Sequence, residues 1–266
     1  MAVRSSAIFE ALEKIAPLRF AEPWDNVGLI LAPRDSQDFH RVFLTIDLTA
    51  ETLQECLDEE ADFCIAYHPP VFSGLKRLRL SEPEESVAVR ALCSGLTVYS
   101  PHTALDACAG GMNDWLAQAL GPGESCPIAP SPENSNLGGG RLVQLNTPVR
   151  LEQALDLVKE YLGLGHLRLA RGVNHQPDQM IRSLAVCPGA GGSLFEQVQH
   201  ADLFLTGEMR HHDVLGRQRK NSSVILTDHT NTERGYLPRL KERLQSELPG
   251  LEVVVSKTDA DPLRVV

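Results

Sequence analysis

Short apolar runs rich in β-branched residues recur along this chain, and amphipathic segments separate them. Runs of this length that end at turn residues predict buried β-strands. They lie at residues 41–47, 61–67, 96–101, 141–146, 167–171, 181–187, 201–206, 222–227 and 251–256. Segments with apolar residues at helical spacing occupy residues 5–16, 50–60, 84–94, 111–120, 151–162, 192–200, 208–219 and 234–247. This alternation predicts an α/β fold in which helices cover mixed sheets.

One stretch interrupts the alternation. Residues 121–140 are rich in proline and glycine and also contain several serine and asparagine residues. Such a composition is typical of a loop or linker. We therefore predict a first α/β lobe at residues 1–120, a linker at 121–140 and a second α/β lobe at 141–266, whose C-terminal part could return to the first lobe.

The composition is that of an ordinary globular protein, with 42% hydrophobic and 23% charged residues. The formal net charge of -10 disfavours direct binding of nucleic acid, which requires clustered lysine and arginine. No apolar run approaches the ~18 residues that a membrane-spanning helix needs, and the start has no signal-peptide pattern. The six cysteines form no CxxC pair and lie mostly in apolar runs, which predicts buried reduced thiols. We expect a cytoplasmic protein without a membrane partner.

Residue types that bind metals follow four of the predicted strands. In open α/β sheets, ligands bind in the crevice at the carboxyl ends of the strands. In chain order, the candidates are His68, His102, Asp106, Glu208, His211, His212, His229 and Glu233. Histidines and carboxylates that converge at such an edge predict a divalent-metal site. Because the linker divides the candidates, a single site would lie in the cleft between the lobes.

Each candidate also has an ordinary structural explanation. His68 ends a strand before two prolines, and a histidine there can simply hydrogen-bond to its surroundings. Asp106 can cap a turn, although its burial without a partner would be costly. His102 and Asp106 would share one face of a helix, whereas the neighbouring Pro101 and two later glycines favour a loop. Glu233 fits the first turn of a helix through the helix dipole. The spacing His-x-x-x-Asp/Glu nevertheless occurs twice, each time after a strand.

Two further segments have two explanations each. The glycine-rich run at residues 187–193 follows a strand, and it either forms a phosphate cradle or makes a tight turn. It contains neither the full dinucleotide-binding fingerprint nor a P-loop lysine. Near the start of the chain, Asp25 or Asn26 either lines the cleft or belongs to an ordinary turn.

The residue types also limit the chemistry. Histidine with carboxylate suits Zn, Mn, Fe or Ni better than Ca or Mg, which prefer oxygen ligands. A glutamate can bridge two ions, and two ions about 3.5–4 Å apart activate a water molecule and bind the oxygens of the displaced group. The expected reaction is hydrolysis of a phosphoester, an amide or a ring amidine. Glu208 and His212 are the candidate general acid and base, or they orient the metal ligands.

Five short sequences form an ordered set along the chain. They are Trp24-Asp25-Asn26-Val27-Gly28, Tyr67-His68-Pro69-Pro70, Ser100-Pro101-His102-Thr103-Ala104-Leu105-Asp106, Gly207-Glu208 with His212, and His229-Thr230-Asn231-Thr232-Glu233-Arg234-Gly235. In this order they resemble the NIF-three-like family, and the resemblance covers essentially the whole chain. The second and the last sequence look most similar to the animal branch. Bacterial members of the family are labelled type 2 GTP cyclohydrolase I-like.

The resemblance implies two linked α/β lobes, which assemble into a homohexamer that is a trimer of dimers. It also implies two divalent metal ions per subunit. The implied metal ligands are His68, Asp106, His229 and Glu233. Glu233 would bridge the two ions, and His102 would be a further ligand or a neighbour of the ligands. Glu208 and His212 would line the pocket.

One position departs from the family pattern. Bacterial members have two adjacent histidines where this chain has Tyr67 and His68. A phenol keeps its proton near neutral pH, so Tyr67 is a poor metal ligand. We therefore expect that one of the two metals binds more weakly, binds through other ligands or is absent. Some relatives also insert an extra small domain between the lobes, whereas residues 121–180 here provide little more than one βαβ-sized segment.

Two functions of different classes follow from the resemblance. The first is a metal-dependent hydrolase of a nucleotide or phosphate ester, with a small phosphorylated substrate. The second is an interaction protein that acts as a transcriptional co-regulator through protein partners, with a nuclear as well as a cytoplasmic location. A role in metal handling or in the control of damaged metabolites is a third hypothesis. An open metal position beside an acid or base favours the enzyme.

Overall fold

The computed structural model describes residues 2–35 and 37–265, apart from the side chain of Glu84. These residues form two compact units, each with its own large sheet. The first unit contains Met1–Leu105 and Tyr236–Ala260, and the second contains Asp106–Gly235 and Asp261–Val266. A segment from the C-terminal part of the chain therefore belongs to the first unit.

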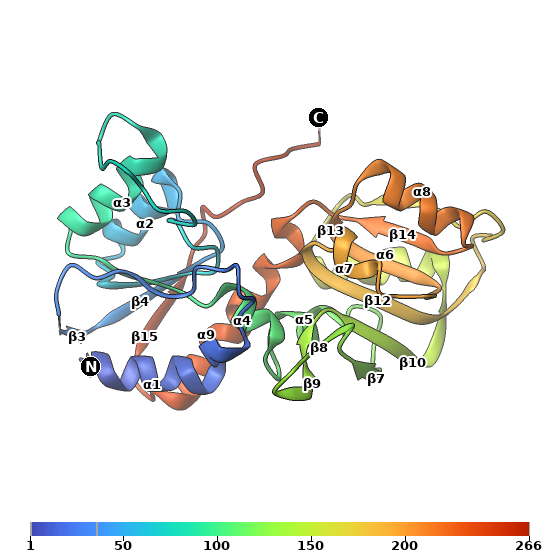
Figure 1. The fold of residues 1–266 in the computed structure, drawn as a ribbon, viewed down its shortest axis with the longest axis horizontal. Coiled ribbons are helices and arrows are strands. Elements are labelled where there is room, and N and C mark those ends of the chain that lie inside the picture. The colour runs from blue at the N-terminus through green and yellow to red at the C-terminus, as the bar shows by residue number, and fades with distance from the viewer. Residues whose placement is uncertain (1, 36, 266) are drawn as a thin grey trace. The chain divides into compact units, whose positions relative to one another are not determined.

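A five-stranded sheet with the strand order β15-β4-β5-β6-β2 forms the centre of the first unit (Figure 1). Its strands are β2 (Gly28–Leu31), β4 (Arg41–Thr45), β5 (Phe63–Ala66), β6 (Thr97–Ser100) and β15 (Glu252–Val255). Strands β15, β4, β5 and β6 are parallel, and β2 is antiparallel to β6 at the edge. Parallel strands are covered on both faces, which explains why β5 is a continuous apolar run.

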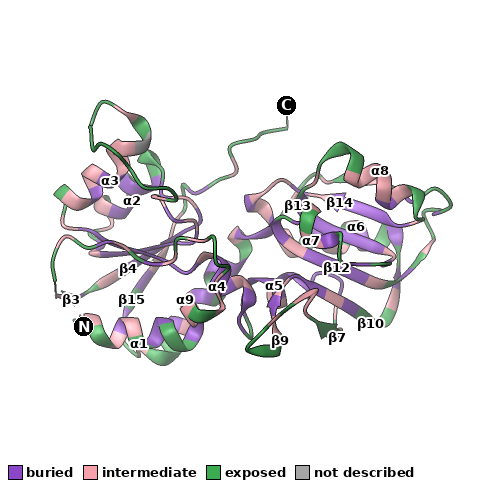
Figure 2. Ribbon diagram, viewed as in Figure 1, coloured by how far each residue is buried: buried purple, intermediate pink, exposed green. Residues whose placement is uncertain are grey.

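Helices cover both faces of this sheet (Figures 1 and 2). The helices are α1 (Ser5–Ile15), α2 (Ala50–Asp58), α3 (Pro83–Cys93) and α9 (Leu237–Glu247). On one face, Leu53 of α2 and Ala91 of α3 pack with Phe43 of β4. On the other face, Phe9 of α1 contacts the ring of Phe63, with ring centroids 6.0 Å apart. A short pair of strands and a 3-10 helix complete the unit: β1 (Val3–Arg4), β3 (Asp38–Phe39) and η1 (Leu18–Phe20).

A six-stranded sheet with the order β11-β14-β13-β12-β10-β7 forms the centre of the second unit. Its strands are β7 (Gly123–Cys126), β10 (Arg141–Arg150), β11 (Arg168–Ala170), β12 (Met180–Ala190), β13 (Leu203–Glu208) and β14 (Ser223–Leu226). Strands β12, β13 and β14 are parallel, and the other three are antiparallel to their neighbours. The carboxyl ends of the three parallel strands therefore meet at one edge, where ligands bind in open α/β sheets.

Helices also cover both faces of the second sheet (Figure 1). They are α5 (Met112–Leu116), α6 (Leu151–Leu162), α7 (Gly192–Phe195) and α8 (His211–Arg219). Ala154 and Val158 of α6 pack with Leu184 of β12 on one face. On the other face, Phe195 of α7 packs with Phe204 of β13. Further elements are the strand pair of β8 (Ala129–Ser131) and β9 (Asn134–Gly139), α4 (His102–Ala107), η2 (Thr230–Thr232) and η3 (Arg234–Tyr236).

The fold class predicted from the sequence, α/β with mixed sheets covered by helices, is confirmed. Every predicted strand coincides with a strand of the structure. The helices predicted at 111–120 and 192–200 are shorter than expected and reduce to α5 and α7. None of the described helices combines the length and the apolar content that crossing a membrane requires. All six cysteines are free thiols, of which Cys56, Cys64 and Cys108 are buried as expected, while Cys93 and Cys126 are exposed.

Two segments differ from the structure that their composition favours. Residues 121–140 form strands β7, β8 and β9 rather than a loop or linker, and they lie in the second unit. Glycine allows this because an added Cβ at Gly138 would collide with the carbonyl oxygen of Ala129 across the strand pair. Residues 102–107 form helix α4 rather than a loop, since the carbonyl of Pro101 accepts hydrogen bonds from the amides of Ala104 and Leu105. His102 and Asp106 therefore lie four residues apart on one short helix.

We predict that Glu55 fixes the segment after β15. Its carboxylate accepts hydrogen bonds from the amides of Lys257 and Thr258 and from the hydroxyls of Ser256 and Thr258. Burial opposes ionisation, but these hydrogen bonds outweigh it and lower the pKa of Glu55. We expect Glu55→Gln to lower the free energy of unfolding by about 1–3 kcal/mol at pH 7, as hydrogen bonds to a charged group do.

The pH dependence follows from the sign of this shift. A folded-state pKa below the unfolded value of about 4.3 stabilises the protein above that value, and the stabilisation disappears as the pH falls through the folded-state pKa. Urea unfolding at pH 7 and below pH 4 should therefore show a difference between wild type and Glu55→Gln that shrinks in acid. Glu10→Gln is the control, since Glu10 is an exposed carboxylate on α1. An equal effect of both variants would contradict this role of Glu55.

Candidate functional site

His68 of the first unit lies at the carboxyl end of β5. The amides of Tyr67 and His68 donate to the carbonyls of Thr45 and Ile46, at 2.9 and 3.0 Å, which continues the pairing with β4. The Nδ1 atom of His68 lies 2.9 Å from a carboxylate oxygen of Asp47, which follows β4. In metal sites, a carboxylate that holds one ring nitrogen of a histidine orients the other nitrogen toward the ion. Asp47 is thus placed to orient His68 as a ligand.

A second aspartate–histidine pair lies in the same unit. The Nδ1 atom of His102 is 2.8 Å from a carboxylate oxygen of Asp25. The other oxygen of Asp25 accepts hydrogen bonds from the amide and the hydroxyl of Thr103. Burial of Asp25 opposes its ionisation, but the hydrogen bonds from His102 and Thr103 outweigh burial and lower the pKa of Asp25. The carboxylate therefore stays charged and holds His102 in one orientation.

The backbone of His102 is also unusual. Its φ angle is +25°, a left-handed value that residues other than glycine rarely adopt. Strain of this kind costs about 1–3 kcal/mol and concentrates at functional sites. The rings of His68 and His102 meet edge to face at 5.2 Å, and the ring of Tyr67 lies 4.9 Å from His68 and 5.4 Å from His102. The first unit therefore brings His68 and His102 together around a buried tyrosine.

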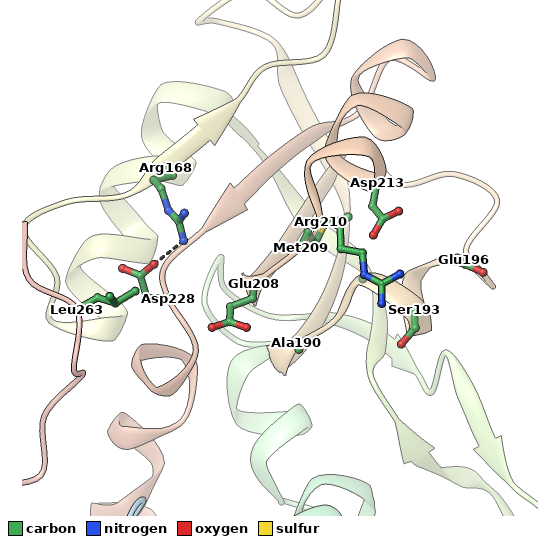
Figure 3. Close-up of a pocket in the computed structure, with 11 residues that line it drawn as sticks. Arg168, Ala190, Ser193, Glu196, Glu208, Met209, Arg210, Asp213, Asp228 and Leu263 are labelled. Atoms are coloured by element: carbon green, nitrogen blue, oxygen red, sulfur yellow. Dashed lines mark hydrogen bonds and ion pairs between the residues drawn. The ribbon is translucent and has the colours of Figure 1, made fainter.

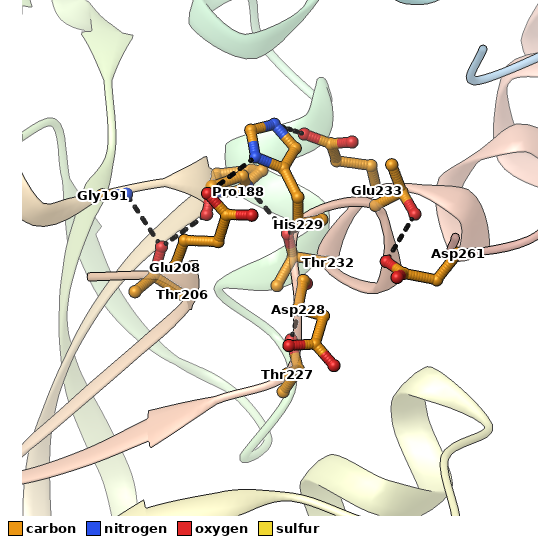
Figure 4. A network of polar contacts seen from close by, with 12 residues as sticks. Pro188, Gly191, Thr206, Glu208, Thr227, Asp228, His229, Thr232, Glu233 and Asp261 are labelled. Carbon is orange, nitrogen blue, oxygen red and sulfur yellow. Dashed lines mark hydrogen bonds and ion pairs between the residues drawn. The ribbon is translucent and has the colours of Figure 1, made fainter. Parts of the chain in front are cut away.

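In the second unit, His229 lies between two carboxylates after strand β14 (Figure 4). Its Nε2 atom is 3.4 Å from Oε1 of Glu233, and its Nδ1 atom is 3.5 Å from Oε2 of Glu208 at the end of β13. Both distances are too long for good hydrogen bonds. Two ligands of one tetrahedral ion, with bonds of about 2.0–2.2 Å, lie roughly 3.3–3.6 Å apart. The separation between His229 and Glu233 therefore suits two ligands of the same metal ion.

Glycines allow the backbone to approach this pair closely. At Gly189, which has a φ angle of +62°, an added Cβ would lie 2.6 Å from Nε2 of His229 and 2.8 Å from Oε1 of Glu233. The amide of Gly189 donates to the hydroxyl of Thr232 at 2.7 Å. That hydroxyl in turn donates to the carbonyl of His229. Gly189 therefore belongs to a tight turn, and the turn fixes the ligand pair rather than only reversing the chain.

Asp106 and Glu233 both lie near the thiol of Cys187 in the second unit. Burial raises the pKa of the Cys187 thiol, and the negative charges of Asp106 and Glu233 raise it further. Both carboxylates thus lie close enough to Cys187 to act on it. Glu233 is only 2% exposed, and a carboxylate buried to this degree needs compensation by hydrogen bonds or a cation. Asp106, His229 and Glu233 supply the mixed nitrogen and oxygen donors that zinc or manganese accepts.

A cavity of about 510 Å³ lies in the second unit at the carboxyl ends of its parallel strands (Figure 3). Ala190, Glu208 and Asp228 line it from β12, β13 and the end of β14. Arg168 forms an ion pair with Asp228, and Arg210 lines the wall beside Met209. Its size is that of a site for one small molecule. Glu208 both lines this cavity and faces His229, so it can act on a molecule bound there.

The two predicted catalytic residues have different surroundings. Glu208 contacts His229, as described above. His212 is exposed in the first turn of α8, and its ring contacts that of His211 at 5.3 Å. The catalytic role of His212 therefore stays a prediction, with less structural support than that of Glu208.

Two aspartates are more important in the structure than the sequence pattern indicates. Asp47 is not among the candidates from the sequence, although it follows β4 in the same way that the candidate ligands follow their strands. Asp25 holds His102 instead of serving only in a turn. The strand-end pattern identifies Asp47 when it is extended to every carboxylate. The partner of Asp25 is 77 positions away in the sequence, so no local pattern identifies it.

Comparisons with known proteins identify the family of the chain. Residues 3–262 match the family described as Duf34/NIF3 (NGG1p interacting factor 3), and the chain belongs to that family. It is 39% identical to the NIF3-like protein 1 of Drosophila melanogaster, over 98% of this chain and 89% of the relative. It is 36% identical to the NGG1-interacting factor 3 of Saccharomyces cerevisiae, over 97% of this chain and 96% of the relative.

The fold agrees with a solved structure. The crystal structure of a Bacillus cereus protein related to NIF3 superposes with a TM-score of 0.87, although only 18% of the aligned residues are identical. The match covers 99% of each chain. At this level of identity, the likeness supports the fold alone.

We predict that Gly189→Ala disrupts the ligand pair. The added methyl group would contact both His229 and Glu233, and the left-handed backbone alone costs about 1–2 kcal/mol. Gly163→Ala is the matched control, because Gly163 has a φ angle of +69° and open space where the Cβ would lie. Both variants should lose stability in thermal unfolding, and Gly189→Ala should lose more because its methyl group also displaces His229 and Glu233. Only Gly189→Ala should weaken zinc binding, by at least about tenfold, as measured in competition with a chromophoric chelator. Equal zinc affinity of the two variants would contradict the role of Gly189 in positioning His229 and Glu233.

Proposed function

We propose that this protein is a divalent-metal-binding, hydrolase-like protein that acts on a nucleotide or another phosphate ester. The observation that carries the proposal is the pair of His229 and Glu233. It offers one nitrogen and one buried oxygen at the separation of two ligands of one ion. The glycine turn above it leaves no room for a side chain. Family membership agrees with the proposal without fixing the reaction.

The metal ligands in this proposal are His68, Asp106, His229 and Glu233. Asp47 orients His68 through a hydrogen bond, which is the usual support for a ligand histidine. Asp25 holds His102 in the same manner, so His102 is a ligand or a direct neighbour of the ligands. We propose two ions per subunit with Glu233 as the bridge, because a carboxylate has two oxygens to share.

The residues around the ligands define what the site can do. A divalent ion supplies an activated water molecule and polarises an oxygen of the substrate. Glu208 is 52% exposed at its side chain and lines the cavity, so it can exchange protons with a bound molecule and with solvent. Arg210 adds a positive charge to the cavity wall for a phosphate oxygen. These positions support hydrolysis with Glu208 as the general acid or base.

A second function has a specific observation in its favour. The yeast relative carries the name of an interacting factor. The net charge of -10 suits protein partners better than nucleic acid. In this alternative, the chain is a non-enzymatic transcriptional co-regulator, and its metal ions are structural. We also propose a homohexamer built as a trimer of dimers and a location in both cytoplasm and nucleus, neither of which decides between the two functions.

The two functions differ in metal content and turnover. We expect wild-type protein purified without chelator to contain about two divalent ions per chain by mass spectrometry. His229→Ala and Glu233→Gln should each lose metal because each removes a ligand. Glu208→Gln should keep its metal but hydrolyse the best compound in a panel of nucleotides and phosphate esters about 10²–10⁴ times more slowly. Absence of metal from folded, metal-resupplied wild type would reject the hydrolase and favour the interaction protein.

We expect Tyr67 to determine how firmly one of the two proposed ions is bound. Its ring is 2% exposed and contacts both His68 and His102. A neutral phenol is a poor ligand, so one ion should dissociate first during titration with a chelator. We expect Tyr67→His to strengthen retention of that ion and Tyr67→Phe to leave retention unchanged. A loss of metal in Tyr67→Phe would show instead that the tyrosine oxygen is a ligand.

A further inference from the structure

An exposed pair of aromatic side chains lies beside the histidines of the first unit. Trp24 is 61% exposed and Phe72 is 52% exposed. Their ring centroids are 6.1 Å apart, and the ring planes are inclined at 49°. Trp24 also meets the ring of His102 edge to face at 6.1 Å. Two large apolar rings exposed at the side of a candidate metal ligand are unusual for a surface that serves only folding.

Polar contacts hold this aromatic pair in place. Asp25, directly after Trp24, has a fully buried carboxylate that bonds to His102 and Thr103. The hydroxyl of Thr103 also accepts a hydrogen bond from the amide of Glu22, at 3.0 Å. The side-chain amide of Asn26 donates to the carbonyl of Val71, next to Phe72, at 2.6 Å. Hydrogen bonds on both sides of Trp24 therefore tie the two aromatic residues to one rigid frame.

The rings form a continuous series toward the ligands. Phe72 contacts Trp24, Trp24 contacts His102, and His102 contacts His68. A planar ring that stacks on Trp24 would therefore have its substituents near the imidazoles that hold the metal. Stacking on an exposed aromatic side chain is available to any heteroaromatic ring, because every such ring has a π face. A sugar phosphate without a ring system gains nothing from these side chains.

We propose that Trp24 and Phe72 form a stacking subsite for the heteroaromatic ring of a small-molecule substrate. The subsite makes this protein select nucleotide-like molecules over phosphate esters that lack such a ring. The proposal rests on the proposed function for the role of the ligand as a substrate, whereas ring binding itself requires no metal. Lys76 and Arg77 belong to the same exposed segment as Phe72 and give it a positive charge in an acidic chain.

Intrinsic fluorescence tests the subsite directly, because the chain contains only two tryptophans, Trp24 and the partly buried Trp115. Wild-type protein is first stripped of metal with EDTA. It is then titrated separately with adenosine 5′-monophosphate, guanosine 5′-monophosphate and ribose 5-phosphate. The same titrations of Trp24→Phe, in which Trp115 is the remaining indole, correct for light absorbed by the nucleotides. Both nucleotides should quench the Trp24 emission saturably, and ribose 5-phosphate should not.

Calorimetry of variants provides the second readout. Trp24→Ala should weaken nucleotide binding about five- to 100-fold, the range expected for loss of one stacked base. Trp24→Phe should keep most of the affinity. Leu80→Ala is the control, since Leu80 is apolar and 66% exposed but has no ring on which a base could stack. All variants should unfold at wild-type temperature because the changed side chains are exposed.

The outcomes separate this proposal from the metal chemistry. Nucleotide binding without metal, combined with a failure to find hydrolysis, would leave the stacking subsite intact and reject the hydrolase. Equal affinity for ribose 5-phosphate and the nucleotides, or unchanged affinity in Trp24→Ala, would overturn the subsite. A blue shift of the Trp24 emission that depends on protein concentration alone would also overturn it, because it would assign the aromatic pair to contact with a second copy of the chain.

Discussion

The buried carboxylate of Glu233 is the constraint on which the second unit depends. A charge that is 2% exposed is costly unless its surroundings compensate for it, and the structure places an imidazole nitrogen 3.4 Å away. Gly189 approaches the pair as closely as a residue without a side chain can. The turn, the short helix η2 and the ends of β12 and β14 are arranged around these two side chains. A divalent ion would satisfy the charge, the separation and the donor types together.

In the first unit, carboxylates orient the candidate ligand histidines. There, each candidate histidine is held by an aspartate through Nδ1, and both aspartates come from segments other than the one that carries the histidine. Such pairs fix the orientation of a ring before an ion arrives, which lowers the entropic cost of binding. His102 has a left-handed backbone, which is locally strained, and this strain accompanies the placement of its ring. Each unit therefore has its own candidate ligands: pre-oriented imidazole nitrogens in the first, and the imidazole of His229 beside the buried carboxylate of Glu233 in the second.

The sequence predicted the parts of this arrangement that depend on local pattern. Strands such as 63–66 and 223–226 are short apolar runs, and the residues that follow them identify His68 and His229. The sequence did not reveal the strand pairing of residues 121–140, because glycines that permit close backbone approach look the same as glycines in a loop. It also could not pair Asp25 with His102 or Glu208 with His229, since those contacts depend on how distant strand ends meet. Propensity describes single segments, whereas the orientation of a ligand is a property of the tertiary fold.

X-ray absorption spectroscopy of the zinc-loaded protein tests most directly which atoms surround the metal. We predict a first shell of nitrogen and oxygen atoms at about 2.0–2.2 Å, with the outer-shell scattering of imidazole rings. We predict no sulfur, because all of the proposed ligands are histidines and carboxylates. A sulfur shell at about 2.3 Å, or a shell of oxygen atoms without imidazole, would contradict this prediction.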